Sequence, residues 1–171
     1  MADAAAEKRV FSDSAELTAA VGEHLGYSEW AAIDQSRIDA FADATGDHQW
    51  IHVDPERAAS GPFGTTVAHG YLTLSLVPVL VSSLLDYAGW PVKINYGSNK
   101  VRFPMPVPVE SAVRAGVEVA AVTEAPAGLQ VALKVTVEIR NPSGEVAGKP
   151  ALVAETLGFP ANLLERGDGR P

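Results

Sequence analysis

The feature that most constrains the fold is an apolar run at residues 68–85, which is hydrophobic on nearly every side. A helix without a polar face has to be buried, so the rest of the chain must supply a surface that surrounds it. Pro78 lies inside the run and predicts a kink or a break. The leucines that recur every four residues, as along one line of an α-helix, are Leu72, Leu76, Leu80 and Leu84.

The second half of the chain predicts that surrounding surface, because its hydrophobic period changes from helical to two. Residues 113–120 and 131–140 alternate between apolar and polar side chains, which is the pattern of half-buried strands. Turn residues follow each strand, and residues 92–103 and 147–159 extend the series, so we expect consecutive antiparallel strands. The predicted fold class is therefore α+β, with a curved antiparallel sheet wrapped around a central buried helix.

Shorter helices are predicted before the apolar run. Asp13 and Gly26 supply a start and a stop for a helix over residues 13–25. After a short strand at residues 30–33, Asp34 caps a second helix that ends at Gly46. Residues 54–55, an Asp-Pro pair, begin another helical turn. The segment between Gly46 and this pair is therefore expected to be a loop between two helix caps.

The length of 171 residues suits one domain, which we place at residues 11–163. The ends are mostly small, polar or charged, so residues 1–10 and 164–171 are expected to be flexible tails. The beginning of the chain does not resemble a secretory signal, and no apolar stretch reaches the ~18 residues of a membrane span. We therefore expect a cytoplasmic protein with no membrane segment.

Composition restricts the chemistry that the chain can perform. Without cysteine it has no disulfide, no thiolate nucleophile and no cysteine metal site, so histidines, carboxylates, hydroxyls and backbone amides must suffice. A formal net charge of -8 disfavours nucleic acid as a partner.

Three residues form a set that can move a proton and hold a negative oxygen. Asp47 and His52 lie five positions apart in the segment between the helix caps, and Gly70 opens the apolar helix. Backbone N–H groups and the dipole at a helix N-terminus both stabilise an oxyanion. Each residue alone has a plainer explanation: a turn for Asp47, a half-buried histidine for His52 and close packing for Gly70. Together they predict an active site.

The motifs of this region resemble those of the MaoC-like, R-specific enoyl-CoA hydratases, which have the hot-dog fold. The similarity covers roughly residues 28 to 160, and Gln49-Trp50 stands where that family has Asn-Pro. The matching stretches are Phe41, Ala44-Thr45-Gly46-Asp47, Ile51-His52, Ala58, Ala68-His69-Gly70 and Asn99-Lys100-Val101-Arg102-Phe103-Pro104.

The resemblance implies a hydro-lyase of fatty acid metabolism that adds water to trans-2-enoyl-CoA and gives (R)-3-hydroxyacyl-CoA. Hydration needs a base, an acid and a donor for the enolate oxygen, and Asp47, His52 and the Gly70 N–H suit these tasks. The absence of a Cβ at Gly70 is expected to let the thioester come close.

The resemblance also implies how the substrate binds. CoA carries phosphates, and Arg102 followed by Phe103 is expected to clamp a phosphate and the adenine or pantetheine, with Lys100 nearby. An ordinary solvated strand face explains these residues equally well. The implied enzyme uses acyl-CoA as its substrate, needs no cofactor and forms a homodimer, because the family joins sheet edges across subunits.

Other functions use the same residues or fewer. A 3-hydroxyacyl-thioester dehydratase acting on carrier-protein substrates would run the chemistry in reverse, and a non-catalytic acyl-binding hot-dog subunit would need no chemistry. A thioesterase is disfavoured because residues 71–85 offer no carboxylate. No metal site is predicted, although His48 and His52 are four apart, because Gln49 replaces the glutamate of a zinc protease. We expect His48 to face solvent and His69 only to pack or hydrogen-bond near the helix start.

Overall fold

The computed structural model describes residues 5–162. Its elements in chain order are β1 (Arg9–Phe11), α1 (Ser14–Ala19), β2 (His24–Tyr27), β3 (Ala31–Ile33), α2 (Gln35–Thr45), α3 (Trp50–Val53), α4 (Pro55–Ala59), α5 (Gly70–Ser82), β4 (Leu85–Tyr87), β5 (Val92–Arg102), β6 (Ser111–Ala125), β7 (Gly128–Arg140) and β8 (Leu152–Ala161).

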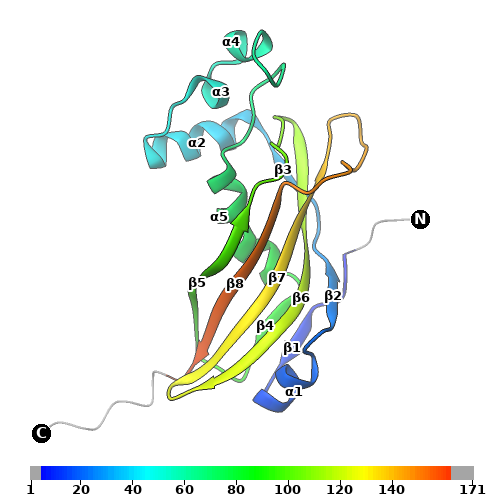
Figure 1. The fold of residues 1–171 in the computed structure, drawn as a ribbon, viewed down its shortest axis with the longest axis vertical. Coiled ribbons are helices and arrows are strands. Elements are labelled where there is room, and N and C mark those ends of the chain that lie inside the picture. The colour runs from blue at the N-terminus through cyan, green and yellow to red at the C-terminus, as the bar shows by residue number, and fades with distance from the viewer. Residues whose placement is uncertain (1–4, 163–171) are drawn as a thin grey trace, which may run out of the picture.

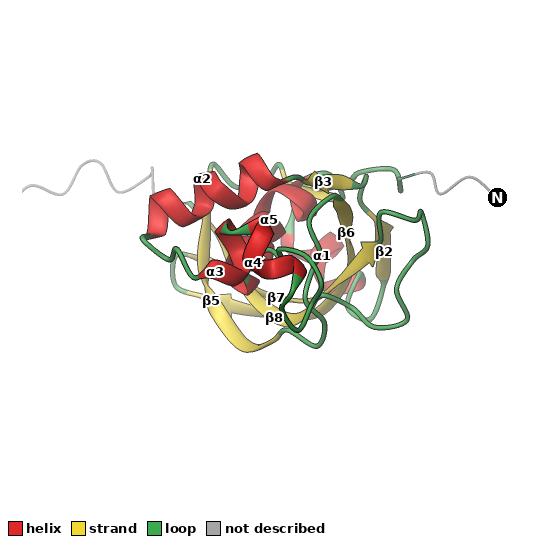
Figure 2. Ribbon diagram, turned by 90° about the horizontal axis from the view of Figure 1, so that it is seen from above, coloured by secondary structure: helices red, strands yellow, loops and turns green. Residues whose placement is uncertain are grey.

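The main sheet has the strand order β2-β6-β7-β8-β5, and β3 also pairs with β6 (Figure 1). It curves around α5, as the view from above shows, with α2 on the open side of the curve (Figure 2). Alternate residues of β6 and β7, such as Val117 and Val135, are fully buried and join the same hydrophobic core as Leu72 and Leu80 of α5. This arrangement confirms the predicted curved antiparallel sheet around a central helix.

The strand order differs from the expected consecutive one, because β5 pairs with β8 instead of β6. Residues 103–110, between β5 and β6, contain three prolines, which lack the N–H groups of a regular hairpin. This connection crosses the molecule and hydrogen-bonds to the segment before α5: Ala68 N–H donates to the Val107 carbonyl at 2.8 Å, and Val109 N–H donates to the Thr66 carbonyl at 3.0 Å. The crossing therefore fixes residues 66–68.

The amino-terminal prediction is corrected in two places. The helix predicted for residues 13–25 ends at Ala19, because Gly22 N–H donates to the Val119 carbonyl and the chain then pairs with β6 as β2. Residues 9–11, partly inside the predicted tail, form β1 and pair in parallel with β4, which buries Phe11. The carboxy-terminal tail predicted at residues 164–171 lies outside the described residues.

The central helix also differs from expectation. It continues through Pro78 without a break. It is not buried on every side of the single chain: Tyr71 is 70% exposed and Val79 is 60% exposed, although Leu72 and Leu80 lie in the core. One face of an otherwise apolar helix is therefore left open. Within residues 5–162, no helix has the length and hydrophobicity needed to cross a membrane.

The predicted caps around the motif are confirmed. The Asp34 carboxylate accepts the Arg37 N–H at 2.8 Å at the start of α2, and Gly46 ends that helix with a left-handed φ of 77°. The Asp54 carboxylate accepts the Arg57 N–H at 3.0 Å, so α4 begins as expected. The segment between the caps is not a simple loop, however, because it contains the short helix α3.

Candidate active site

The chain brings Asp47 and His52 together, as their spacing predicted. Asp47 lies in the turn after α2 and is exposed, whereas His52 lies on α3 and is buried. A carboxylate oxygen of Asp47, a ring nitrogen of His52 and a ring nitrogen of His69 all lie within 4.8 Å of one another. His69, the third residue of this cluster, was expected only to pack or hydrogen-bond near the helix start, and its place beside the pair was not predicted.

The His52 ring has a defined tautomer. Its Nδ1 lies 2.6 Å from the Val67 carbonyl oxygen, and a carbonyl only accepts, so Nδ1 carries the hydrogen. In the uncharged ring Nε2 therefore has a free lone pair. The main chain of His52 is held as well, because its N–H donates to the Gln49 carbonyl at 2.9 Å and its carbonyl accepts the Gln35 amide at 2.8 Å. The ring is thus presented on a fixed backbone.

Gln35, the first residue of α2, is a supporting residue that the sequence did not reveal. Its amide nitrogen donates to the His52 carbonyl, and its amide oxygen accepts the Thr66 hydroxyl at 2.6 Å. It therefore joins α2, α3 and the segment before α5. These partners are 17 and 31 residues away along the chain, so no local pattern indicated them.

Burial lowers the pKa of His52 below its ordinary value of 6.5, and the nearby His69 lowers it further. The hydrogen bond to Val67 and the charge of Asp47 act in the opposite direction. Since the net shift is downward, His52 is uncharged at neutral pH, with Nε2 ready to accept a proton.

His48 lies outside this cluster. Its ring is about half exposed and pairs with Asp43, with 2.9 Å between Nε2 and the carboxylate oxygen. That bond raises the pKa of His48 above its ordinary value. The expectation that His48 faces solvent is confirmed.

Gly70 is the first residue of α5, so its N–H has no acceptor within the helix. Across residues 5–162 this N–H makes no hydrogen bond. A Cβ on Gly70 would lie 3.1 Å from three ring carbons of Phe103, tighter than most real contacts. Phe103 therefore lies where a Cβ would project, so a larger residue at position 70 would press on this ring. The expectation that the missing Cβ lets the thioester come close stays a prediction.

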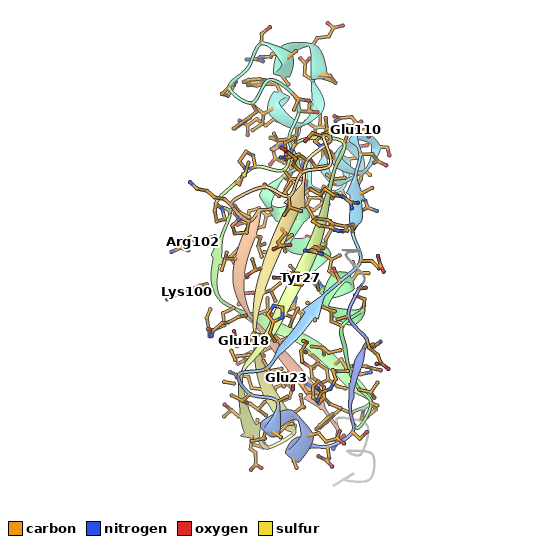
Figure 3. All side chains as sticks on the ribbon, turned by 90° about the vertical axis from the view of Figure 1, so that its right-hand side faces the viewer. Glu23, Tyr27, Lys100, Arg102, Glu110 and Glu118 are labelled. Atoms are coloured by element: carbon orange, nitrogen blue, oxygen red, sulfur yellow. The ribbon has the colours of Figure 1, made fainter. Side chains whose placement is uncertain are left out.

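The three residues expected to bind CoA separate into two groups. Phe103 lies against Gly70 and packs near Tyr71, with 6.1 Å between the ring centroids. Lys100 and Arg102 project outward from the edge strand β5 (Figure 3). The Arg102 guanidinium donates to the Val101 carbonyl at 2.8 Å. The sequence placed all three on one strand, but only Phe103 reaches the helix start.

The cluster of Asp47, His52 and His69 has the donor types of a metal centre but not its geometry. The two imidazoles are stacked, with ring centroids 3.7 Å apart and ring planes only 25° apart. Nitrogen lone pairs lie in the ring planes, so in stacked rings they lie in two nearly parallel planes, and an ion between the rings would lie outside both planes. The arrangement fits proton transfer better than metal binding.

A cavity of about 520 Å³ lies between α5, β5 and β8. It starts at Leu74, four residues beyond Gly70 on the same helix, and its walls are mainly apolar. The apolar lining residues include Leu74, Val77, Val81, Leu85, Leu133 and Leu157. Trp50 does not line it, because its ring packs against Gly61 and beneath the Arg57 guanidinium.

Comparison with known proteins places this geometry in context. A family model described as the MaoC like domain matches residues 16–139. The 3-hydroxyacyl-thioester dehydratase Z of Mycobacterium tuberculosis is 52% identical over 150 residues, covering 87% of this chain and 96% of that protein. Nodulation protein N of Rhizobium leguminosarum bv. viciae is 44% identical over 151 residues, covering 84% of this chain and 88% of that protein.

A solved structure, the (R)-hydratase from A. caviae involved in PHA biosynthesis, superposes with a TM-score of 0.64 at 24% identity. The match covers 81% of this chain and 95% of that one. At this identity the likeness shows the fold alone.

Proposed function

The chain belongs to the MaoC-like domain family, and on that premise we propose that it is an R-specific enoyl-CoA hydratase. Its hot-dog fold and its membership of the hydro-lyase class follow from the relatives and structural neighbours. The proposed reaction adds water to a trans-2-enoyl-CoA and gives the (R)-3-hydroxyacyl-CoA.

The observation that carries the proposal is the convergence of the Asp47 carboxylate and the His52 ring within 4.8 Å. A carboxylate and an uncharged Nε2 are both acceptors, so together they can hold the two hydrogens of one water. One of them takes a proton as the water oxygen bonds to C3 of the enoyl thioester, and the electron pair moves to the thioester oxygen. Asp47 or His52 then gives a proton to C2, and the enolate collapses to the thioester.

Both new bonds form from the one side of the substrate that faces this pair, which supports a single stereochemical outcome. The developing enolate oxygen needs a donor, and the unpaired Gly70 N–H at the start of α5 is the proposed one. In other enzymes the loss of such a donor costs on the order of 10²-fold to 10³-fold in turnover.

The acyl chain is proposed to occupy the apolar cavity along α5, which opens one turn beyond Gly70. Phe103 lies at the junction between Gly70 and β5, so the thioester would pass beside its ring. Lys100 and Arg102 on the outer edge of β5 remain the proposed contacts for the CoA phosphates. Neither makes an ion pair within the described residues, so both are open to a phosphate.

A homodimer is the proposed assembly. Strand β5 pairs only with β8 among the described strands, so its other edge is open. The exposed face of α5 also leaves Tyr71 and Val79 uncovered in the single chain. A second copy would pair the open edge and cover the apolar residues.

A 3-hydroxyacyl-thioester dehydratase is the second candidate, favoured by the name of the Mycobacterium tuberculosis relative. It would use the same residues in reverse, on CoA or on carrier-protein thioesters. Comparing crotonyl-CoA with a crotonyl carrier protein as substrates for the purified chain separates the two carriers. A tenfold preference for the carrier protein would replace the CoA proposal.

The test of the main proposal follows the loss of enoyl-thioester absorbance when the purified protein meets crotonyl-CoA. The wild type is expected to hydrate it, whereas Asp47→Asn and His52→Ala each lose about 10²-fold to 10⁴-fold in turnover, the usual contribution of a positioned acid or base. Asp43→Asn and His24→Gln are matched controls on exposed residues and are expected to retain activity. An inactive wild type would support the acyl-binding subunit instead.

A further inference from the structure

His69 is the residue immediately before α5, and its side chain contacts both members of the proposed catalytic pair. Its Nε2 lies 2.9 Å from the main-chain carbonyl oxygen of Asp47. Its ring stacks on the His52 ring, with 3.7 Å between centroids. The centroid of the Phe41 ring lies 5.1 Å from that of His69, and His69 is only 3% exposed. The ring is therefore confined between α2, α3 and the start of α5.

The hydrogen bond defines the hydrogen positions on this ring. A carbonyl accepts only, so Nε2 of His69 donates to Asp47. The other nitrogen, Nδ1, is buried and has no hydrogen-bond partner among the residues that the structure describes. A buried polar atom without a partner costs free energy. An apolar side chain could fill the same space without that cost. The buried Nδ1 is therefore an energetic cost of this side chain, whereas the Nε2 bond to Asp47 is a contact that an apolar side chain could not make.

We propose that His69 is a positioning residue, whose N–H holds the peptide that carries Asp47 while its ring holds the plane of the His52 imidazole. This inference rests on the proposed function, because it assigns a task within the same reaction. His69 need not touch the substrate. It acts through the two residues that do.

The tether matters because Asp47 has little else to hold it. Its carboxylate is exposed and accepts only a long bond of 3.4 Å from Gln49 N–H, and its own N–H reaches the Thr45 hydroxyl at 3.5 Å. The bond from His69 to the carbonyl is the shortest of these contacts. Misplacing a reacting group by about 1 Å can cost on the order of 10²-fold in rate.

The stacked ring acts on His52 in two ways. It blocks rotation of the imidazole out of the plane set by its bond to Val67. It also excludes water from that face and places a second imidazole where a charge on His52 would be unfavourable, which lowers the pKa of His52. The charged group near His52 is Asp47, which favours the protonated form.

Two substitutions separate the donor from the ring. His69→Gln places an amide N–H near the position of Nε2 and so can still donate to Asp47, but it removes the stacked ring. His69→Leu fills the space and removes both. His24→Gln, at an exposed position of β2, is the matched control. Each variant is assayed for hydration of crotonyl-CoA, and the His52 ring is titrated by NMR.

We expect kcat to fall on the order of 10²-fold in His69→Leu with KM changed less than about threefold, since the thioester contacts remain. The kcat of His69→Gln should be at least about tenfold higher than that of His69→Leu. In both variants the NMR titration of His52 should move to higher pH, because the stacked imidazole is gone. His24→Gln should match the wild type in both measurements.

The proposal would be overturned if His69→Gln and His69→Leu lost the same amount of kcat and the His52 titration did not move. A wild-type kcat in His69→Leu would overturn it as well. If His69→Leu does not fold, as judged by circular dichroism, His69→Gln decides through the His52 titration alone. If the wild type proves inactive on enoyl thioesters, the proposed function fails, while the His52 titration still tests the contact with His69.

Discussion

At the scale of single residues, the candidate site consists of one buried imidazole with a defined tautomer and one exposed carboxylate. The Val67 carbonyl orients the His52 ring, and burial keeps it uncharged. Asp47 lies at the surface, beside this buried ring. Different environments suit acid–base chemistry, because they give the two groups different tendencies to bind a proton.

The lowered pKa of His52 predicts how stability depends on pH. The unfolded chain titrates His52 near 6.5 and the folded chain at a lower pH, so the unfolded state binds more protons between those values. The free energy of unfolding should therefore be largest above about pH 6.5 and fall as the pH drops through the folded pKa. Urea unfolding at a series of pH values measures this slope.

His52→Gln removes the titrating ring and should flatten that slope. His48 has a raised pKa and acts with the opposite sign, since its contribution is present below 6.5 and lost as the pH rises through the folded value. The protein with His52 and the His52→Gln variant are therefore compared with His48→Gln present in both. An equally steep acid slope after removal of His52 would show that other groups cause it.

At the scale of elements, the site depends on where α5 begins. The proline-rich crossing between β5 and β6 holds residues 66–68, which places Val67 against His52, and the next residue, His69, bonds to Asp47. The end of β5 then brings Phe103 over Gly70. Three segments distant in the chain thus meet at one helix N-terminus.

Gly70→Ala is predicted to impair turnover by displacing Phe103. The added Cβ would lie 3.1 Å from the ring, which must shift by a few tenths of an ångström. We expect kcat to fall about tenfold. Global stability should change by less than about 1 kcal/mol, because the better helix propensity of alanine offsets the strain. Steady-state kinetics and urea unfolding measure the two quantities.

Phe103→Leu provides the second arm of a double-mutant cycle. If the ring contact causes the loss, Gly70→Ala should cost less turnover in the Phe103→Leu chain than in the wild type. Additive losses would mean that the two residues act independently.

At the scale of the whole molecule, the single chain leaves a side open. The outer edge of β5 lacks a paired strand among the described residues, and the exposed face of α5 carries the large hydrophobic residues Tyr71 and Val79. A central helix that is hydrophobic all round needs more cover than one sheet provides.

Val79→Lys is predicted to weaken the proposed dimer, because Val79 is 60% exposed on α5 and a charge there would have to be buried. Light scattering should give about twice the chain mass of 17.9 kDa for the wild type and a shift toward one chain mass for the variant. Val10→Lys is the matched control, since Val10 is 54% exposed on β1. A wild type at one chain mass would contradict the dimer.

The sequence by itself determined the long strands, the central helix and the helix ends around the motif, and it predicted the pair Asp47 and His52. Strict alternation in residues 113–120 and 131–140 dictates strands, because side chains of a strand point to opposite faces in turn. An apolar helix must be covered, and Asp34, Gly46 and Asp54 mark helix ends through local hydrogen bonds and a left-handed φ. These signals act over a few residues, so they could be read without the fold.

Tertiary structure alone decided which segments meet. The pairing of β5 with β8, the early end of α1 and the shift of Leu25 into a strand all depend on partners far away in the chain. The contacts of His52 with Gln35, Val67 and His69 are of the same kind. Hydrogen bonds and ring stacking between distant residues leave no periodic trace in a sequence, because their geometry exists only after the chain has folded.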